Sequence, residues 1–578
     1  MTSAPAGKDT PELRKARGAF FTPEALCRYM AGWAIRSSAD AVLEPSCGEA
    51  AFLLAAADRM SALGTGPGRL HGVDVHPASA REAQRRLALT GYPTRIEVAD
   101  FFTLPPKPKF DVVLGNPPFV RYQDFSGAAR VRSREAALNA GVNLTELASS
   151  WAAFTVHSAL FLKPGGRLAL VLPAGLLSVN YAAEVRRFLI RRFGRVRLVL
   201  FTERIFPGVL EEVLLLLAEG AGGTDHCELQ QVRDLGQLLG PAGGFDGQGG
   251  YDGEGGYGGQ GGFDGQGGFD RGTVSNWRPG IEDVKWTSAL LSAPARDVMA
   301  TVSADPAATT LHTWGETTLG AVTGNNGYFT RSPEQVRTAG LDPERDLVRL
   351  SPPGSRHLRG LHFSTQDWTA LGAEGGANWL FRPSGEPSPA GREYIRTGER
   401  IGVPEAYKCR IRKPWWRVPL VAPADLLLTY MNADTPRVTV NQAGVHHLNS
   451  VHGIYLRPAH RRLGAELLPL ACLNSLTLLG AETVGRAYGG GLLKIEPREA
   501  DRLPVPAPAL VETYRSELLS VRPQVARALA EGRLLDAVSL VDGVLAQGLS
   551  LSQDQVMVIR EARELLAGRR TARTSAPS

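Results

Sequence analysis

The sequence predicts an α/β protein whose first part is a doubly wound, mostly parallel sheet. Up to about residue 240, short apolar runs of strand length alternate with segments of helical periodicity, which is typical of a sheet covered by helices on both faces. Beyond this part the composition changes twice, first to a glycine-rich repeat and then to a mixture of Trp, Pro, Gly and Arg. The 578 residues are enough for roughly three or four folded units.

The elements of the first part, residues 1–242, follow from their periodicity. Leu, Phe and Ile recur at helical spacing in 50–63 and 185–192, which predicts helices there. Short apolar runs between such segments predict strands at 41–43, 70–75, 110–114, 167–172, 196–201 and 213–217.

Residues 243–272 separate the first part from the rest of the chain. They contain five near-copies of a hexad such as GGFDGQ, in which half or more of the residues are glycine. Ordering glycine costs more backbone entropy than ordering any other residue, so we expect a flexible linker or inserted loop. A fold built from repeats is the alternative, but a period of six is too short for the common helical or propeller units.

Two further regions follow the repeat. Residues 273–510 are expected to form a mixed α/β or β-rich domain, and residues 511–578 two or three helices with a frayed tail. No apolar run approaches the roughly 20 residues of a membrane span, and the N-terminus has no apolar signal core. We therefore expect a cytoplasmic protein without membrane contact. The five cysteines form no CxxC pair, so a zinc ribbon, a redox motif and a disulfide framework are not expected.

The most informative motif is Asn116-Pro117-Pro118-Phe119, just after the predicted strand 110–114. A polar residue, two prolines and an aromatic form a rigid lip at the carboxyl edge of the sheet, where α/β proteins bind ligands. The Asn116 amide and the proline carbonyls offer hydrogen-bond acceptors, and the Phe119 ring offers a stacking face. This combination suits a planar base with an exocyclic amino group. The alternative is a proline-rich turn with a buried Phe.

Three acidic residues stand at predicted strand ends upstream of that motif. Glu44 begins the turn EPSCG between the first strand and a helix. Asp74 ends the second strand, at a position where an acid can bind ribose hydroxyls, and Asp100 follows a third strand. Each acid alone could cap a helix or lie on the surface. Three such acids in order are hard to explain as caps alone.

Together these motifs resemble the gamma class of DNA adenine-N6 methyltransferases, the TaqI type. The ordered motifs of that family are matched by Phe21-Thr22-Pro23, EPSCG, GVD, ADF, NPPF, LKPGG at 162–166 and Phe206-Pro207. The resemblance is close over residues 18–220 and looser in the C-terminal part, through YKCRIRKPWWRVP and YGGGLLKIEP. It implies a Rossmann-like class I methyltransferase sheet, followed by a mixed α/β target-recognition domain and C-terminal helices.

The resemblance also implies S-adenosylmethionine as the cofactor. Asp74 would bind the ribose hydroxyls, while Asp100 and Phe101 would hold the adenine of the cofactor. The full set that would line this pocket is Thr22, Glu44, Pro45, Ser46, Cys47, Asp74, Asp100, Phe101 and Pro118.

By the same resemblance the NPPF motif would be catalytic. Asn116 and the Pro117 carbonyl would accept the two hydrogens on N6 of adenine. Phe119 would stack on the flipped-out base, and Phe206 would pack against that base from elsewhere in the chain. The family often has Tyr where Phe119 stands, but the ring face does the stacking, so the lost hydroxyl matters little.

A basic and aromatic segment within 273–510 predicts DNA contact. Lys408, Arg410 and Arg412 precede Trp415 and Trp416, and such a combination suits phosphates together with sugars or bases. A buried tryptophan pair is the alternative. The net charge of the chain, +6, permits a nucleic-acid partner without requiring one.

A cluster of arginines and a cluster of histidines can each be explained by a structural role as well as by a functional one. Six arginines within 186–197 suit either phosphate contact or a solvated helix face. His446, His447 and His452 have no Cys or clustered acids beside them. We therefore expect loop or core histidines there, and no metal site.

The sequence thus predicts a site-specific methyltransferase that modifies N6 of a flipped-out adenine in double-stranded DNA. It would be the modification enzyme of a restriction-modification or related defence system. We expect a monomer, with any cognate restriction endonuclease on a separate chain, because no convincing PD…ExK nuclease motif is present. The alternatives with the same chemistry are an RNA base methyltransferase and a protein glutamine N-methyltransferase. Enzymes of the latter kind are small, and the long basic and aromatic C-terminal part disfavours that alternative.

Overall fold

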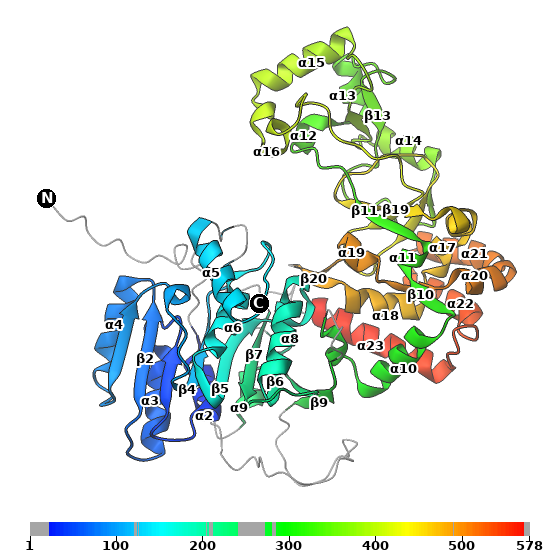
Figure 1. The fold of residues 1–578 in the computed structure, drawn as a ribbon. Coiled ribbons are helices and arrows are strands. Elements are labelled where there is room, and N and C mark those ends of the chain that lie inside the picture. The colour runs from blue at the N-terminus through cyan, green and yellow to red at the C-terminus, as the bar shows by residue number, and fades with distance from the viewer. Residues whose placement is uncertain are drawn as a thin grey trace. The chain divides into compact units, whose positions relative to one another are not determined.

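The computed structural model divides the chain into two compact units, Met1–Leu290 and Leu291–Ser578 (Figure 1). The residues that the structure describes are 22–120, 124, 127–203, 205–206, 212–240, 272–279, 285–488 and 490–571. The predicted linker up to residue 271, together with the motif residues Phe21 and Pro207, lies outside the described residues.

A nine-stranded sheet forms the centre of the first unit, with the strand order β3-β2-β1-β4-β5-β7-β6-β8-β9. Neighbouring strands pair in parallel, except that β7 runs antiparallel between β5 and β6 and β9 runs antiparallel to β8. The predicted mostly parallel, Rossmann-like sheet is confirmed. Its strands are β1 (Ala41–Glu44), β2 (Arg69–Asp74), β3 (Thr94–Val98), β4 (Phe110–Gly115), β5 (Leu162–Pro173), β6 (Arg195–Phe201), β7 (Val213–Glu219), β8 (Cys227–Val232) and β9 (Thr273–Trp277).

Helices of the first unit connect these strands and pack along the sheet (Figure 1). The predicted helices 50–63 and 185–192 are present as α3 and α8. The helices are α2 (Glu24–Ala34), α3 (Ala51–Ala62), α4 (Pro77–Leu87), α5 (Gly127–Asn139), α6 (Ser150–Ala159), α7 (Gly175–Ser178), α8 (Ala183–Arg192) and α9 (Leu235–Leu239), with short 3-10 turns η1 (Phe101–Thr103), η2 (Asn180–Ala182) and η3 (Thr287–Leu290).

Strand β5 is longer than the predicted strand 167–172. It begins at Leu162, so the LKPGG segment lies inside the strand and not before it. In the ladder with β4, Phe110 faces Leu162 and Val112 faces Arg167, so the residues between them bulge out of the pairing. Gly165 has a φ of 76°, a left-handed conformation that glycine adopts readily, and this permits the bulge.

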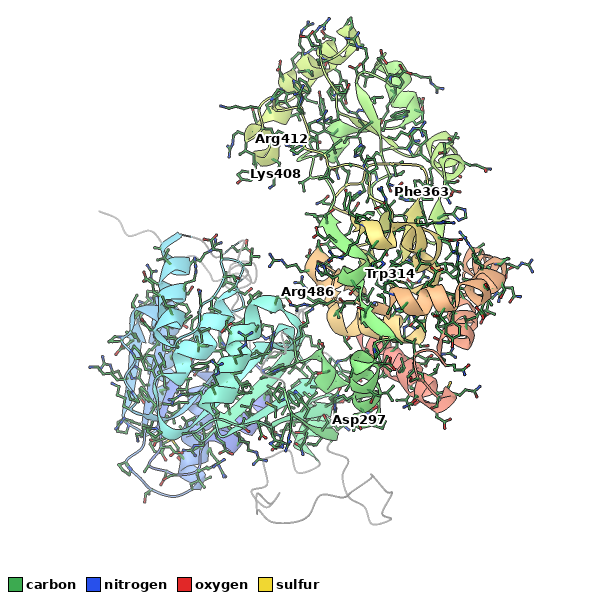
Figure 2. The ribbon with its side chains drawn as sticks, turned by 45° about the vertical axis from the view of Figure 1, so that its right-hand side comes forward. Asp297, Trp314, Phe363, Lys408, Arg412 and Arg486 are labelled. Atoms are coloured by element: carbon green, nitrogen blue, oxygen red, sulfur yellow. The ribbon has the colours of Figure 1, made fainter. Side chains whose placement is uncertain are left out.

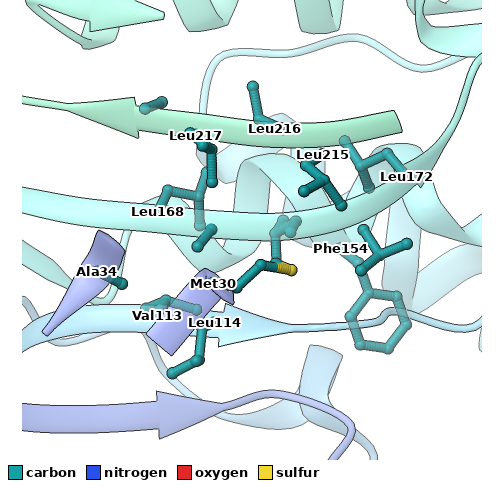
Figure 3. Close-up of a cluster of buried hydrophobic side chains, with 14 of the residues drawn as sticks. Met30, Ala34, Val113, Leu114, Phe154, Leu168, Leu172, Leu215, Leu216 and Leu217 are labelled. Carbon is teal, nitrogen blue, oxygen red and sulfur yellow. The ribbon is translucent and has the colours of Figure 1, made fainter. Parts of the chain in front are cut away.

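The core of the first unit lies between α2 and the central strands. Met30 and Ala34 of α2 are buried with Val113 of β4 and Leu168 of β5 (Figure 3). The central strands are continuous apolar runs because both of their faces are covered. Burying each Leu or Met of this kind contributes about 1.5–3 kcal/mol. The strand ends that carry the predicted motifs therefore stand on a well-packed sheet.

The first unit extends past the predicted boundary at residue 273. The residues after the hexads form β9, which pairs with β8 and so covers an edge that would otherwise be unpaired. Trp277 and Trp286 are buried with their ring centroids 5.7 Å apart, and the N–H of Trp286 donates to the Leu177 carbonyl at 2.8 Å. The second unit begins at Leu291. Strand β9 and the tryptophan pair precede this residue and are part of the first unit.

The second unit is a mixed α/β structure, as predicted. Its largest sheet has the order β11-β19-β16-β18-β14, and the smaller sheets are β12-β15-β13, β17-β21-β20 and β10-β22. The strands are β10 (Ala308–Thr310), β11 (Gly315–Leu319), β12 (Thr330–Arg331), β13 (Leu347–Arg349), β14 (His362–Phe363), β15 (Trp379–Phe381), β16 (Leu426–Thr429), β17 (Met431–Asn432), β18 (Val438–Asn441), β19 (Val451–Leu456), β20 (Arg486–Tyr488), β21 (Leu492–Lys494) and β22 (Pro504–Pro506). The helices are α10 (Ala293–Ala304), α11 (Leu311–Trp314), α12 (Asn326–Phe329), α13 (Pro333–Thr338), α14 (Thr365–Ala373), α15 (Pro389–Arg400), α16 (Tyr407–Arg410), α17 (Arg461–Ala471), α18 (Ser475–Val484), α19 (Pro497–Ala500), α20 (Pro508–Thr513), α21 (Arg515–Ala530), α22 (Leu534–Leu545) and α23 (Gln553–Thr571), with 3-10 turns η4 (Val403–Glu405) and η5 (Pro458–His460).

The C-terminal region is helical, as expected, but it is part of the second unit. Helix α23 packs on α18 and α10. Arg570 near its end is buried, pairs with Glu482 of α18 at 2.8 Å, and donates to the carbonyl oxygens of Ala433 and Gly491. The predicted boundary at 510 therefore falls inside a single packed unit.

No single helix among the described residues is long and apolar enough to cross a membrane. One pair, Pro458–Ala471 with Ser475–Val484, reaches the required length and composition together, but it is bent by 89°.

Candidate active site

The carboxyl ends of β1 and β2 form the first part of the candidate site. Gly48, in the turn after β1, donates its N–H to Asp74 Oδ2 at 2.8 Å, and His76 donates its N–H to Asp74 Oδ1 at 2.8 Å. These bonds orient the carboxylate and use two of its about four lone-pair positions, so acceptors remain for hydroxyl groups. A Cβ added at Gly48 would meet nothing within 4 Å, so open space lies beside this turn.

The EPSCG turn connects β1 to α3 and is largely buried. The carboxylate of Glu44 accepts the N–H of Leu53 at 3.3 Å, and burial raises the pKa of Glu44 well above its ordinary value. Pro45 and Cys47 are buried beside it, and the N–H of Cys47 donates to the Val73 carbonyl at 2.9 Å. Burial likewise raises the pKa of the Cys47 thiol. Both side chains therefore favour their neutral forms in this turn.

Two hydrogen bonds orient Asn116, and its side-chain oxygen takes part in neither of them. Its Nδ2 donates to Thr22 Oγ1 at 3.2 Å, and its main-chain carbonyl accepts the Ser46 hydroxyl at 3.3 Å. The side-chain oxygen, Oδ1, is buried and has no hydrogen-bond partner among the described residues. A buried acceptor without a donor costs about 1–3 kcal/mol. A ligand that donates at this point would remove that cost.

The rest of the NPPF lip is held by Ser150, at the start of α6. Its hydroxyl donates to the Pro118 carbonyl and accepts the N–H of Val120 at 2.9 Å. No donor from the described residues bonds the Pro117 carbonyl. The acceptors left over on the lip are therefore Asn116 Oδ1 and the Pro117 carbonyl.

The end of β3 differs from the arrangement expected for it. Asp100 accepts the N–H of Phe102 at 3.0 Å and also Arg132 Nε at 2.9 Å, so an ion pair already occupies one carboxylate oxygen. Phe101 is only 2% exposed, because the Phe154 ring stacks on it with centroids 5.6 Å apart. The expected role of Phe101, to hold the adenine of the cofactor together with Asp100, stays a prediction, and its ring is covered by other rings in this structure. The half-buried Phe102 is the more accessible ring.

The two rings expected to hold a base are both nearly covered. Phe119 is 8% exposed and Phe206 is 5% exposed, and both belong to the main hydrophobic core of the first unit. A stacked base needs a free ring face, so these rings must be uncovered before a base can stack on them.

The basic and aromatic segment of the second unit divides into an exposed part and an inner part. Lys408 and Arg410 of α16 are exposed, and their charged groups lie 5.7 and 6.0 Å from the ring of Tyr407, which is 64% exposed. Arg412 is instead half-buried and donates to the Thr323 carbonyl at 2.7 Å. Figure 2 labels Lys408 and Arg412 on this segment.

Trp415 and Trp416 belong to the inner part. Both pack against a buried cluster of the second unit, and the Trp415 ring lies 5.6 Å from Tyr328 and 6.2 Å from Phe329. Burial among other aromatics is the alternative stated above for this tryptophan pair. Of the residues predicted to contact DNA in this segment, Lys408 and Arg410 are the exposed ones.

The two remaining clusters are largely structural. Arg186 is buried and donates to the Leu176 carbonyl at 2.5 Å, so it supports the fold of α8. His447 and His452 are buried in the second unit, and burial lowers the pKa of His447 to about 4. The described residues contain no group of three or more His, Cys, Asp or Glu that could hold a metal ion.

Both parts of the chain match known protein families. Residues 7–219 match the family N-6 DNA Methylase, and residues 283–546 match the C-terminal domain of the type II methyltransferase M.Eco57I. The chain thus carries an N-6 DNA methylase domain over residues 7–219. It is an adenine-N6 DNA methyltransferase.

This methylase is similar to type II methyltransferases over most of its length. It is 24% identical over 509 residues to M.XamI of Xanthomonas campestris pv. amaranthicola and 21% identical over 496 residues to M.AccI of Acinetobacter calcoaceticus. Each alignment covers 85% of this chain and 85% of the relative. The solved DrdV–DNA complex aligns at 11% identity with a TM-score of 0.46, covering 89% of this chain and 58% of that chain.

Sequence reasoning missed three residues that shape the site of the methylase: Phe102, Arg132 and Ser150. The doubled Phe after Asp100 was a usable signal for Phe102. Arg132 and Ser150 stand on helices about 30 residues away from the groups they bond, and nothing in the local sequence marks them.

Proposed function

We propose that the methylase transfers a methyl group from S-adenosylmethionine to N6 of an adenine flipped out of double-stranded DNA at a specific site. In this proposal it is the modification enzyme of a restriction-modification system. The observation that carries the proposal is the pair of acceptors Asn116 Oδ1 and the Pro117 carbonyl, which have no donor among the described residues, while the carbonyls of Asn116 and Pro118 are occupied. An exocyclic amino group has two hydrogens to donate and so matches this pair.

The two acceptors act on the nucleophilicity of the amine. The N6 lone pair of adenine is delocalised into the ring, so the free amine attacks poorly. Hydrogen bonds from both N–H groups to Asn116 and Pro117 favour a pyramidal nitrogen whose lone pair points out of the ring plane. This geometry is stabilised more in the transition state than in the ground state, which raises the rate. The methylated nitrogen is cationic and then loses a proton readily, so no strong base is needed beforehand.

The ends of β1 and β2 fit S-adenosylmethionine. The unused acceptor positions of Asp74 suit ribose hydroxyls, and the open space at Gly48 lets a ligand approach the backbone. When bound, the cofactor supplies an electrophilic methyl group on sulfur. Asp100 would hold the cofactor's adenine while sharing or releasing Arg132. Further lining is assigned to Thr22, Glu44, Pro45, Ser46, Cys47 and Pro118.

The substrate base must leave the double helix to reach the lip. Extrusion costs a few kcal/mol, because pairing and stacking are lost. We assign the compensating contacts to Phe119 and Phe206, since stacking on an aromatic ring contributes about 1–3 kcal/mol per base. Both rings are nearly buried, so the base must displace whatever covers them.

Contact with the DNA backbone is assigned to the exposed part of the basic and aromatic segment 407–416, which we call the α16 segment. Lys408 and Arg410 are exposed cations beside an exposed aromatic ring, which suits phosphates and the adjacent sugars. Arg412, Trp415 and Trp416 support this segment from its inner side. We further propose that the enzyme acts as a monomer and that any cognate endonuclease is a separate chain. Light scattering of the purified protein checks the first point.

Transfer of tritium from methyl-labelled S-adenosylmethionine tests the proposed function. The acceptors are duplex DNA, single-stranded RNA and a glutamine-rich protein, each offered separately. Label is expected in duplex DNA alone, as N6-methyladenine. Label in RNA or protein but not in DNA would refute the proposal. Base-modification sequencing of DNA from expressing cells then identifies the recognised site.

A further inference from the structure

We propose that Ser150 is a positioning residue for methyl transfer, which acts by fixing the backbone of the NPPF lip on both sides of Phe119. This inference rests on the proposed function of the lip. It adds a residue that lies outside every motif and touches neither the base nor the cofactor in that proposal.

The geometry joins Ser150 to the lip at three points. Its hydroxyl donates to the Pro118 carbonyl and accepts the N–H of Val120 at 2.9 Å. Its own N–H donates to the Val120 carbonyl at 3.1 Å. The three bonds therefore bracket Phe119, and the side chain is 2% exposed, so water does not compete for them.

The bond to Pro118 selects which carbonyl of the lip remains free. Two consecutive prolines present two adjacent carbonyls and have no main-chain N–H of their own to donate. The Ser150 hydroxyl occupies the Pro118 carbonyl, while no donor from the described residues occupies the Pro117 carbonyl. The acceptor assigned to the substrate amine is thereby distinguished from its neighbour.

The bond to Val120 fixes the direction of the Phe119 ring. A residue whose preceding and following peptide units are both anchored has little freedom in φ and ψ. Its side chain therefore points in one direction. A ring held in this way has less conformational freedom to lose when an extruded base stacks on it.

Helix α6 does not itself use this hydroxyl. Ser149 is the N-cap residue of the helix and forms no side-chain cap bond, while Ser150 stands at the first helical position with its hydroxyl bonded to the lip. A hydroxyl is required because it both donates and accepts at one atom, which Ala cannot do and which a thiol does only weakly. Helix α6 packs on β5, α5 and α8, so the lip is tied to a buried support.

Ser158 provides a matched control in the same helix. It is 0% exposed, and its hydroxyl has no hydrogen-bond partner among the described residues. Ser150→Ala and Ser158→Ala therefore remove the same atom from the same buried helix, and only the first removes bonds to the lip.

The experiment compares the wild type with Ser150→Ala, Ser150→Thr, Ser150→Cys and Ser158→Ala. For each, we measure kcat, KM for DNA, the Kd for S-adenosylmethionine and the melting temperature. A duplex with 2-aminopurine at the target adenine reports extrusion, because the emission of this base rises when it is unstacked. The duplex carries the site identified by base-modification sequencing.

Ser150→Ala is expected to lower kcat by about ten- to a hundredfold, since small misplacements of reacting groups have effects of this size. Its Kd for the cofactor should stay within about twofold, and the 2-aminopurine signal should fall. Ser158→Ala should match the wild type in kcat and in emission, and Ser150→Thr should recover most of the kcat. If Ser150→Ala does not fold, Ser150→Cys keeps the volume with weak bonds and should show the same loss of kcat and emission.

The inference is overturned if Ser150→Ala, or Ser150→Cys in its place, keeps kcat and emission within twofold of the wild type. It is also overturned if Ser158→Ala shows an equal loss. Failure of the proposed function looks different, because the wild type itself would then place no N6-methyladenine in DNA.

Discussion

The lip after β4 and the α16 segment both combine polar groups with aromatic rings, but they hold those groups in opposite ways. On the lip, Thr22, Ser46 and Ser150 hold Asn116 Nδ2 and the carbonyls of Asn116 and Pro118, while Asn116 Oδ1 and the Pro117 carbonyl have no donor among the described residues. On α16, Lys408 and Arg410 extend into solvent and only the inner side of the segment is anchored. A transition state requires dipoles that are fixed before reaction, whereas phosphate contact depends on charge and tolerates mobile side chains. The contrast between the two regions therefore matches the roles proposed for them.

Removing the buried acceptor of the lip should have the largest effect. Asn116→Ala is expected to lower kcat by at least about a hundredfold, the size of effect seen when one preorganised polar group of an active site is lost. The Kd for S-adenosylmethionine, measured by calorimetry, should change little because Asp74 and Gly48 are intact. A variant with wild-type turnover would show that the lip is not catalytic.

The buried carboxyl beside the lip should give a pH-dependent effect on stability. Burial raises the pKa of Glu44 above its ordinary value of 4.5, so the folded state holds a proton that the unfolded state releases. Stability from this group is therefore present below that value and is lost as pH rises through the folded pKa, by up to about 1.4 kcal/mol per pH unit. Glu44→Gln should remove this decline, which urea unfolding between pH 4 and pH 8 measures. Parallel stability curves for the two proteins would contradict a raised pKa.

The inner part of the basic and aromatic segment, which follows α16, should respond in stability. Arg412→Ala removes the guanidinium that donates to the carbonyls of Val322 and Thr323 and is expected to destabilise the second unit by about 1–3 kcal/mol. Arg410→Ala, which removes an exposed cation two positions away, should stay within about 0.5 kcal/mol of the wild type. Thermal unfolding of both variants checks this pair. Equal losses would erase the distinction between the inner and exposed parts.

Substitutions on the exposed side of α16 should weaken DNA binding, and this is the smallest of the effects predicted here. Lys408→Ala is expected to weaken affinity severalfold for any DNA sequence and to reduce the salt slope by about one. Arg462→Ala removes the same charge from an exposed position on α17 and serves as the control. Fluorescence anisotropy over a series of salt concentrations measures both slopes. If the two variants have the same slope, Lys408 does not contact phosphate.

Sequence reasoning reached further in the first unit than in the second. The acids at the ends of β1, β2 and β3 and the NPPF motif could be placed because each follows an apolar strand, and parallel strands end at one edge of a sheet. The α16 segment could be recognised as basic and aromatic, but its sequence does not predict which of its side chains are buried. Arg412 is as basic as Lys408, and only its bond to Thr323 places it on the inner side. Trp415 is likewise placed inside by its contacts with Tyr328 and Phe329.

Boundaries were also decided by packing. Glycine-rich hexads are a reasonable end for a domain, yet β9 after them completes the first sheet because β8 presents a free edge. In the same way, Arg570 ties the last helix to α18 through a buried ion pair, which no local pattern indicates.

The pattern of apolar runs, turns and acids in the sequence is enough to predict the α/β class, the position of the lip and the kind of acceptor that it carries. These features can be predicted because strand ends and proline geometry are local properties. The choice of the Pro117 carbonyl over that of Pro118, the covering of Phe101 and the ion pair between Arg132 and Asp100 depend on partners distant in sequence. Hydrogen bonds and ring contacts between distant residues exist only after the helices have packed on the sheet, and that step fixed which atoms of the site remain free.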